Sequence, residues 1–307
     1  MPEQIQNRPV LGILLAVLAM SVIGYIDNFI QVIAGEAGLW QFHFCRAVVI
    51  CVLIAGICRV FGWRLRPKSW KAVIWRSGFF SISMVAYFGA AGMIPLAQAA
   101  AGLFTGPIFV LVISALFYGV KIGIWRILAV AVGFVGVILI LRPEQTEFSI
   151  MTVIPLLSGF FYALGGIATR RSCGAETTQT LLFGAFFGLG LFGALGLIWF
   201  TLVPASAEMA ADLPFFTRGW VAPSGVFIFW TLVQAFGSLF AVALLTRGYQ
   251  LTEASYVAVA EYWFLVSAAF WSYQLWAEVP DARAVWGIAA IMIAGLIIVM
   301  RSRATEQ

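Results

Sequence analysis

The stretch PLAQAAAGLFTGPIFVLVISALFYG, residues 95–119, is similar to a second stretch of the same chain, QLTEASYVAVAEYWFLVSAAFWSYQ, residues 250–274. Aligned without a gap, the two share four identities: Leu96 with Leu251, Ala99 with Ala254, Phe109 with Phe264, and Tyr118 with Tyr273. Each stretch is followed by a polar break and an apolar run ending in arginine, GFVGVILILR (133–142) and IMIAGLIIVMR (291–301). The match indicates an internal duplication.

The whole chain is as apolar as these two stretches. Its 307 residues are 63% hydrophobic and 10% charged, with a mean hydropathy of +1.00, whereas soluble domains contain about 25% charged residues. A helix needs about 20 mainly apolar residues to cross a bilayer. Ten segments meet this length: 10–33, 39–61, 71–92, 96–119, 123–141, 150–169, 179–203, 222–246, 250–273 and 284–301. We therefore predict an all-α integral membrane protein with ten transmembrane helices.

The duplication divides these segments into two halves. The matched stretches are the fourth and ninth segments, so each copy holds five, and we place the repeats at residues 8–142 and 148–303. After an odd number of crossings, the second copy enters the membrane from the opposite face. The sequence therefore predicts inverted five-helix repeats, an architecture typical of alternating-access transporters.

The basic residues predict the orientation in the membrane. Most of the 18 Lys and Arg residues fall at the termini and in the connections on the same side, whereas Arg142, Arg218 and Arg283 fall on the other. Basic connections remain in the cytoplasm, so we expect cytoplasmic N and C termini in a multi-pass protein of the bacterial inner (plasma) membrane. The net charge of +5 then reflects orientation, and we expect no nucleic-acid partner.

The sequence gives little basis for cofactor or metal chemistry. Its 4 cysteines show no paired spacing, and the single histidine, His43, cannot build a multi-histidine site. We expect no cofactor, no metal and no enzymatic activity, because the scattered carboxylates form no catalytic cluster. The expected partners are a small-molecule substrate, the lipid bilayer and, as a further hypothesis, protons. The protein is predicted to be a monomer or a homodimer.

Asp27, in the stretch SVIGYIDNFI (21–30), is an acid inside an apolar segment. Counting along the first two segments puts it at nearly the depth of Arg46, with His43 one turn from Arg46 on the same face. A charge at that depth costs about 2.5 to 3.5 kcal/mol on insertion scales. Either Asp27 and Arg46 form a structural ion pair, or they bind substrate, with Arg46 receiving an acid group and Asp27 receiving an amine or holding Arg46. For His43, a packing role is the alternative to binding.

Glu261, in SYVAVAEYWFLVSAAF (255–270), lies near the middle of the ninth segment. Exclusion of water favours the neutral form of a carboxyl group, so Glu261 is the first proton-coupling candidate and Asp27 the second. A structural hydrogen bond to a neighbouring Tyr or Gln is the alternative for Glu261. The remaining candidates for the wall of a binding cavity, each of which could equally be packing, are Tyr256, Tyr262, Trp263, Tyr25, Gln98, Tyr162 and Gln234.

Two glycines punctuate the fourth segment. Gly102 and Gly106 are spaced as GxxxG directly before Pro107. This spacing predicts close approach of another helix and a bend at this point.

The runs FHFCRAVV (42–49) and IPLAQAAAGLFTGPIFVLVISALF (94–117), in a chain of two five-helix halves, resemble the EamA branch of the drug/metabolite transporter superfamily. The resemblance covers nearly the whole chain. It departs after the fourth segment, where that family often has Glu and this chain has Lys121 in YGVKIG; Glu278 takes the comparable place in the second half. The resemblance implies a ten-helix transporter with a central cavity for small metabolites, often moved outward, but one fold serves many cargoes.

We therefore predict a secondary transporter that moves a small organic metabolite by alternating access, with proton coupling as a further hypothesis. An amino acid or related zwitterion is the leading cargo class, because Arg46 and Asp27 offer opposite charges. A planar vitamin or nucleoside-like metabolite is the alternative cargo. The alternative of another class is a non-transporting membrane receptor or scaffold.

Overall fold

The structure is a computed structural model that describes residues 8–92, 96–141, 150–277, 279 and 281–306. All regular secondary structure within these residues is helical, which confirms the all-α prediction. The elements are α1 (Pro9–Ile26), η1 (Asp27–Phe29), α2 (Ile30–Glu36), α3 (Leu39–Val60), α4 (Trp70–Ala91), α5 (Leu96–Leu103), α6 (Gly106–Tyr118), α7 (Ile124–Leu141), α8 (Ile150–Arg171), α9 (Thr178–Leu202), α10 (Ala207–Asp212), α11 (Pro214–Thr217), α12 (Gly225–Leu251), α13 (Ala254–Ala260), α14 (Trp263–Trp276) and α15 (Ala282–Glu306).

Several helices have the length and composition of membrane spans. Four in the described residues are long and apolar enough to cross a bilayer: Pro9–Glu36, Leu39–Val60, Thr178–Leu202 and Gly225–Leu251. Shorter apolar helices lie at Gly106–Tyr118, Ile124–Leu139 and Ala282–Ile297. The chain is thus a multi-pass membrane protein, while the count of ten spans and the cytoplasmic side of the termini stay predictions.

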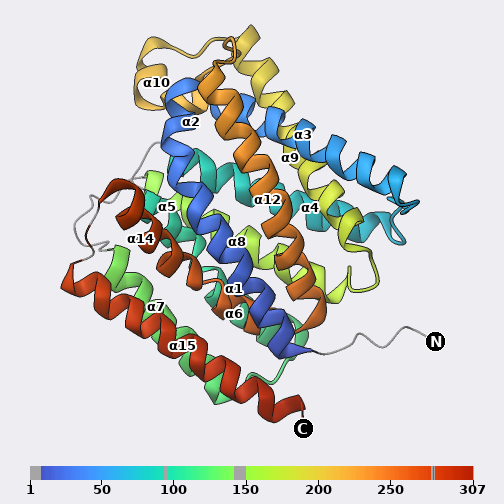
Figure 1. The fold of residues 1–307 in the computed structure, drawn as a ribbon, viewed down its shortest axis with the longest axis vertical. Helices are drawn as coiled ribbons and strands as arrows, with labels where there is room; N and C mark the ends of the chain where they lie inside the picture. The colour runs from blue at the N-terminus through green and yellow to red at the C-terminus, as the bar shows by residue number, and fades with distance from the viewer. Residues whose placement is uncertain (1–7, 93–95, 142–149, 278, 280, 307) are drawn as a thin grey trace.

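The main helix pairs join the two halves of the chain (Figure 1). The long helix α1 packs along α12, and α4 packs along α8. Likewise α3 lies beside α9, and α7 lies beside α15. Each pair takes one helix from before residue 142 and one from after it, so the interior of the molecule lies between the halves.

The two matched stretches are both interrupted helices. The first is split into α5 and α6, with Phe104 and Thr105 between them, and the Thr105 hydroxyl donates to the carbonyl oxygen of Gly102 at 2.6 Å. The glycines and Pro107 predicted this bend. The second is split into α13 and α14 at Glu261 and Tyr262, where the sequence analysis predicted a continuous helix.

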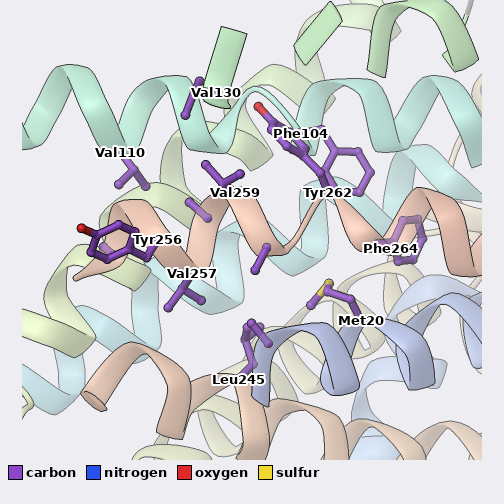
Figure 2. Close-up of a cluster of buried hydrophobic side chains, with 14 of the residues drawn as sticks. Met20, Phe104, Val110, Val130, Leu245, Tyr256, Val257, Val259, Tyr262 and Phe264 are labelled. Atoms are coloured by element: carbon purple, nitrogen blue, oxygen red, sulfur yellow. The ribbon is translucent and has the colours of Figure 1, made fainter. Parts of the chain in front are cut away.

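The buried core surrounds the second interruption (Figure 2). Tyr262 is fully buried and lies against Phe104, with ring centroids 6.1 Å apart. Met20 from α1 and Leu245 from α12 contribute to the same cluster. Packing of the interrupted segments against α1 and α12 therefore holds the residues at the break in place.

Gly102 is the glycine of the predicted pair that requires its small size. A Cβ atom on Gly102 would lie 2.1 Å from the Pro155 Cβ, whereas one on Gly106 would meet its nearest neighbour at 3.5 Å. We expect Gly102→Ala to destabilise the protein by about 1 to 3 kcal/mol through overpacking, which corresponds to a melting temperature roughly 5 °C lower. Thermal unfolding in detergent measures this change.

Gly78→Ala is the matched control for this prediction. Gly78 is also helical, and no heavy atom lies within 4 Å of the Cβ position. The melting temperature of Gly78→Ala should equal or exceed that of the parent, because alanine favours the helix. Equal stability of the two variants would contradict the close packing of α5 on α8.

Candidate functional site

A central cavity lies where the two halves meet. It contains about 770 Å³ of space, including the part open to solvent. Its wall is mostly apolar, as in most small-molecule sites, and the helices that contribute to it come from both halves of the chain. The polar residues in the wall are Asp27, Arg46, Tyr87, Tyr162, Ser238 and Glu261.

Asp27 lies at the junction of α1 and η1 and is 3% exposed. Its carboxylate accepts a hydrogen bond from the Tyr87 hydroxyl at 3.3 Å and one from the Gln234 amide nitrogen at 3.3 Å. The same amide nitrogen donates to the carbonyl oxygen of Ile26 at 2.8 Å. Neutral donors from α4 and α12 therefore hold the acid at the cavity wall.

Arg46 projects from α3 and is 2% exposed. Its Nη2 donates to His43 Nδ1 at 3.2 Å, and its Nη1 contacts Ser238 Oγ at 3.5 Å. The guanidinium lies over the rings of Phe42 and Phe88, 4.6 and 4.7 Å from their centroids. Cation–π contact favours a desolvated guanidinium, so the two aromatic rings help to hold Arg46 at the cavity wall.

Asp27 and Arg46 do not form an ion pair in the described part of the chain. No salt bridge within 4.0 Å therefore supports the interpretation of these two residues as a structural ion pair in this conformation. Within the described residues, Arg46 Nε also lacks a hydrogen-bond partner. The guanidinium thus retains N–H donors that an acid group of a ligand could use.

Glu261 reaches the same cavity from the interruption between α13 and α14. It is 4% exposed, and its Oε1 accepts a hydrogen bond from the Tyr162 hydroxyl at 3.1 Å. From the sequence, Glu261 and the group of Asp27 and Arg46 were predicted to belong to two separate sites. The structure brings them into one cavity with both acids at helix interruptions.

Residues 10–142 match the model of the EamA-like transporter family. The first half of the chain is therefore similar to the EamA-type transporters. A pseudopaline exporter of Pseudomonas aeruginosa is 29% identical over 287 residues, with 92% of this chain and 94% of that protein covered. A riboflavin transporter of Rhizobium johnstonii is 22% identical over 309 residues, covering 96% and 93%.

Two further proteins are similar to this chain. An S-adenosylmethionine uptake transporter of Rickettsia felis is 23% identical over 206 residues, covering 67% of this chain and 63% of that protein. A solved crystal structure has the same fold, with a TM-score of 0.75, coverage of 97% and 99%, and 14% sequence identity. Relatives with these names indicate transport rather than enzymatic activity.

Several residues predicted for the cavity wall lie outside the described wall of the central cavity. Tyr25 packs edge-to-face on Phe29 and Trp271. The Trp263 indole N–H donates to Ser21 Oγ at 3.0 Å. Tyr262 lies in the apolar core. None of these three predicted residues is part of the described cavity wall, so their positions fit packing rather than cargo contact.

Tyr256 lies near the N-terminal end of α13, whereas Glu261 follows its C-terminal end (Figure 2). Tyr256 takes part in a polar contact with Arg126. The Arg126 guanidinium lies over its ring, 4.0 Å from the centroid, and donates to its hydroxyl at 2.7 Å. Arg126 also forms an ion pair with Glu253. This contact joins α7 to the connection between α12 and α13, away from the central cavity. The side chain of Gln98 lies outside the described residues.

His43 and Gln234 are not part of the described cavity wall, but each contacts a residue that is: His43 contacts Arg46, and Gln234 contacts Asp27. Sequence reasoning missed Tyr87 and Ser238, because a tyrosine or serine in an apolar helix carries no signal of its direction. It also counted Arg76 among the loop charges, although Arg76 lies inside the predicted span 71–92 and is 5% exposed. Its position within that span was the available signal.

Proposed function

We propose that this protein is a secondary transporter of a small organic metabolite with an acid group and an amino group, in the bacterial inner membrane. One observation carries the proposal: Arg46 and the acids Asp27 and Glu261 line one cavity, and Arg46 forms no salt bridge with an acid among the described residues. A carboxylate of the cargo would pair with the forked donors of Arg46. The amino group of the cargo would lie near Asp27 or Glu261.

Alternating access requires two halves that can move against each other, and the helix pairs support this. If the halves are exchanged, the first segment takes the place of the sixth and the third takes the place of the eighth. The pair α1 and α12 then becomes the pair α8 and α4, which also pack together. Interrupted fourth and ninth segments fit the same relation, and transporters often bind substrates at such interruptions.

Proton coupling is part of the proposal. The Glu261 carboxyl faces the cavity and accepts a hydrogen bond from a neutral tyrosine. A buried acid without a cationic partner is a functional hypothesis by default in membrane proteins. Asp27 is the second carrier candidate.

A thermal-shift screen of the purified protein against metabolites tests the cargo class. Amino acids should stabilise the parent protein, because a ligand that binds the folded state raises its stability. Val242→Trp should weaken that binding about tenfold by filling part of the cavity, since Val242 lines its wall. Stabilisation by riboflavin or nucleosides alone would instead favour the planar cargo, which the name of the Rhizobium relative supports.

Phe240→Trp is the control for Val242→Trp. Phe240 lies on the same helix, and 52% of it is exposed on the outer face. The variant should bind as the parent does. Equal binding by both tryptophan variants would contradict a cargo site in the central cavity, and a complete absence of ligands would favour the receptor or scaffold alternative.

A further inference from the structure

A second buried arginine, Arg76, lies on α4 and ties together four helices. Its Nε donates to Thr169 Oγ1 on α8 at 3.1 Å, and its Nη2 donates to Thr246 Oγ1 on α12 at 3.2 Å. Its Nη1 donates to the carbonyl oxygen of Leu181 on α9 at 2.9 Å. The guanidinium also lies 5.5 Å from the ring centroid of Phe80. All of these partners are neutral.

The charge of Arg76 has no acidic counterpart among the residues that the structure describes. A guanidinium carries five N–H donors, and the three hydrogen bonds leave two of them for another acceptor. A buried cation is costly unless an anion compensates it. The three hydrogen bonds are therefore sufficient to hold the Arg76 side chain in place, but they leave its positive charge uncompensated.

A second cavity lies beside Arg76. It contains about 340 Å³ of space, including the part open to solvent, and is lined by Arg76, Thr169 and Thr246. This cavity shares Phe80, Tyr162, Val242 and Leu245 with the central cavity. The two compartments are thus adjacent, and the tyrosine between them is the one that donates to Glu261.

The positions of the two arginines give a length scale. Arg46 lies seven residues from the Leu39 end of α3, and Arg76 lies fifteen residues from the Ala91 end of α4. These helices run in opposite directions, so the two ends lie on the same side. At 1.5 Å per residue, the Cα atoms differ by roughly 12 Å along the axes. The two side chains line adjacent cavities, so the positions of the guanidinium groups set the distance between the two acid groups of a cargo.

We propose that Arg76 forms a second acid-binding subsite and that the cargo is an elongated amino diacid. One acid group binds Arg46, the other binds Arg76, and the amine lies toward Asp27 or Glu261. This inference rests on the proposed function and narrows its cargo class. Two cationic anchors in adjacent compartments select for the separation of the two acid groups as well as for their charge.

The test compares linear α-amino diacids with the corresponding ω-amides. The probes are L-aspartate, L-glutamate, L-2-aminoadipate, L-2-aminopimelate and L-2-aminosuberate, each paired with its side-chain amide, and affinities come from thermal shift and isothermal titration. At the best length, the diacid should bind the parent about tenfold more tightly than its amide, because an added charge-assisted hydrogen bond is worth at least that factor. No preference at any length would overturn the proposal.

Arg76→Gln separates binding from scaffolding. It should reduce the preference for the best diacid over its amide to about one, while the affinity for the amide stays within twofold of the parent. Equal losses for diacid and amide would mean that Arg76 only supports the fold. Arg64→Gln, at an exposed arginine in the connection before α4, is the charge-matched control and should keep the preference.

A second variant covers the case in which Arg76→Gln does not fold. Thr246→Val removes one acceptor that positions the guanidinium and should lower the preference for the diacid. The comparison of diacid with amide on the parent protein tests the subsite in either case. If no amino acid binds the parent in an Arg46-dependent way, the proposed function fails and the subsite fails with it. Arg46-dependent binding without a diacid preference overturns only the subsite.

Discussion

Arg46→Ala is expected to lower the affinity for an amino-acid cargo about 100-fold, because the cargo carboxylate loses two charge-assisted hydrogen bonds worth about 1.5 kcal/mol or more each. Among the described residues of the cavity wall, Arg46 has no equivalent replacement. Arg76 lies in the adjacent compartment, and Ser238 is a neutral donor. Titration of the purified variant with the ligands found by the metabolite screen measures the loss, and counterflow in proteoliposomes should fall in parallel.

Two further substitutions show whether the loss of affinity comes from the guanidinium of Arg46. Arg46→Lys keeps the charge but lacks the planar fork, so binding should recover only in part, to about tenfold weaker than the parent. Arg59→Ala changes an exposed arginine at the end of the same helix and should bind normally. If Arg46→Ala binds cargo within twofold of the parent, Arg46 is a scaffold residue and the proposed site is wrong.

Glu261→Gln is expected to abolish proton-driven accumulation while exchange continues. Glutamine has nearly the same shape and can still accept the Tyr162 hydrogen bond through its carbonyl oxygen, but it cannot carry a proton across. With one proton per cargo, a gradient of two pH units drives about 100-fold accumulation at equilibrium. The variant should reach about equal concentrations on both sides of the proteoliposome membrane.

The controls distinguish the two carrier candidates. Accumulation should persist in Asp27→Asn if Glu261 alone carries the proton. Loss of accumulation in Asp27→Asn would assign the role of proton carrier to Asp27. Glu208→Gln, at an exposed acid in α10, should behave as the parent does. If accumulation by the parent protein does not depend on the pH gradient, proton coupling is wrong. If Glu261→Gln still accumulates cargo, Glu261 is not the proton carrier.

Hydropathy predicted the helices well because each backbone amide in lipid must find its partner within its own helix, which makes the signal local. The interruption after Gly102 was also predictable, since glycine and proline mark it in the sequence. The interruption at Glu261 was not, because AVAEYWF contains neither residue. It forms where Tyr262 enters the core beside Phe104, and that packing depends on a segment about 150 residues away.

The sequence by itself determined the all-helical membrane fold, since apolar length acts one segment at a time, and it predicted the depth of Asp27, Arg46 and Glu261 from the helical rise. Only the tertiary structure decided which side chains meet. It gave Asp27 and Arg46 hydrogen-bond partners other than each other, placed Glu261 in the same cavity and gave Arg76 neutral partners on α8, α9 and α12. These contacts depend on the rotation of each helix about its axis and on packing between distant segments, and one residue's depth specifies neither.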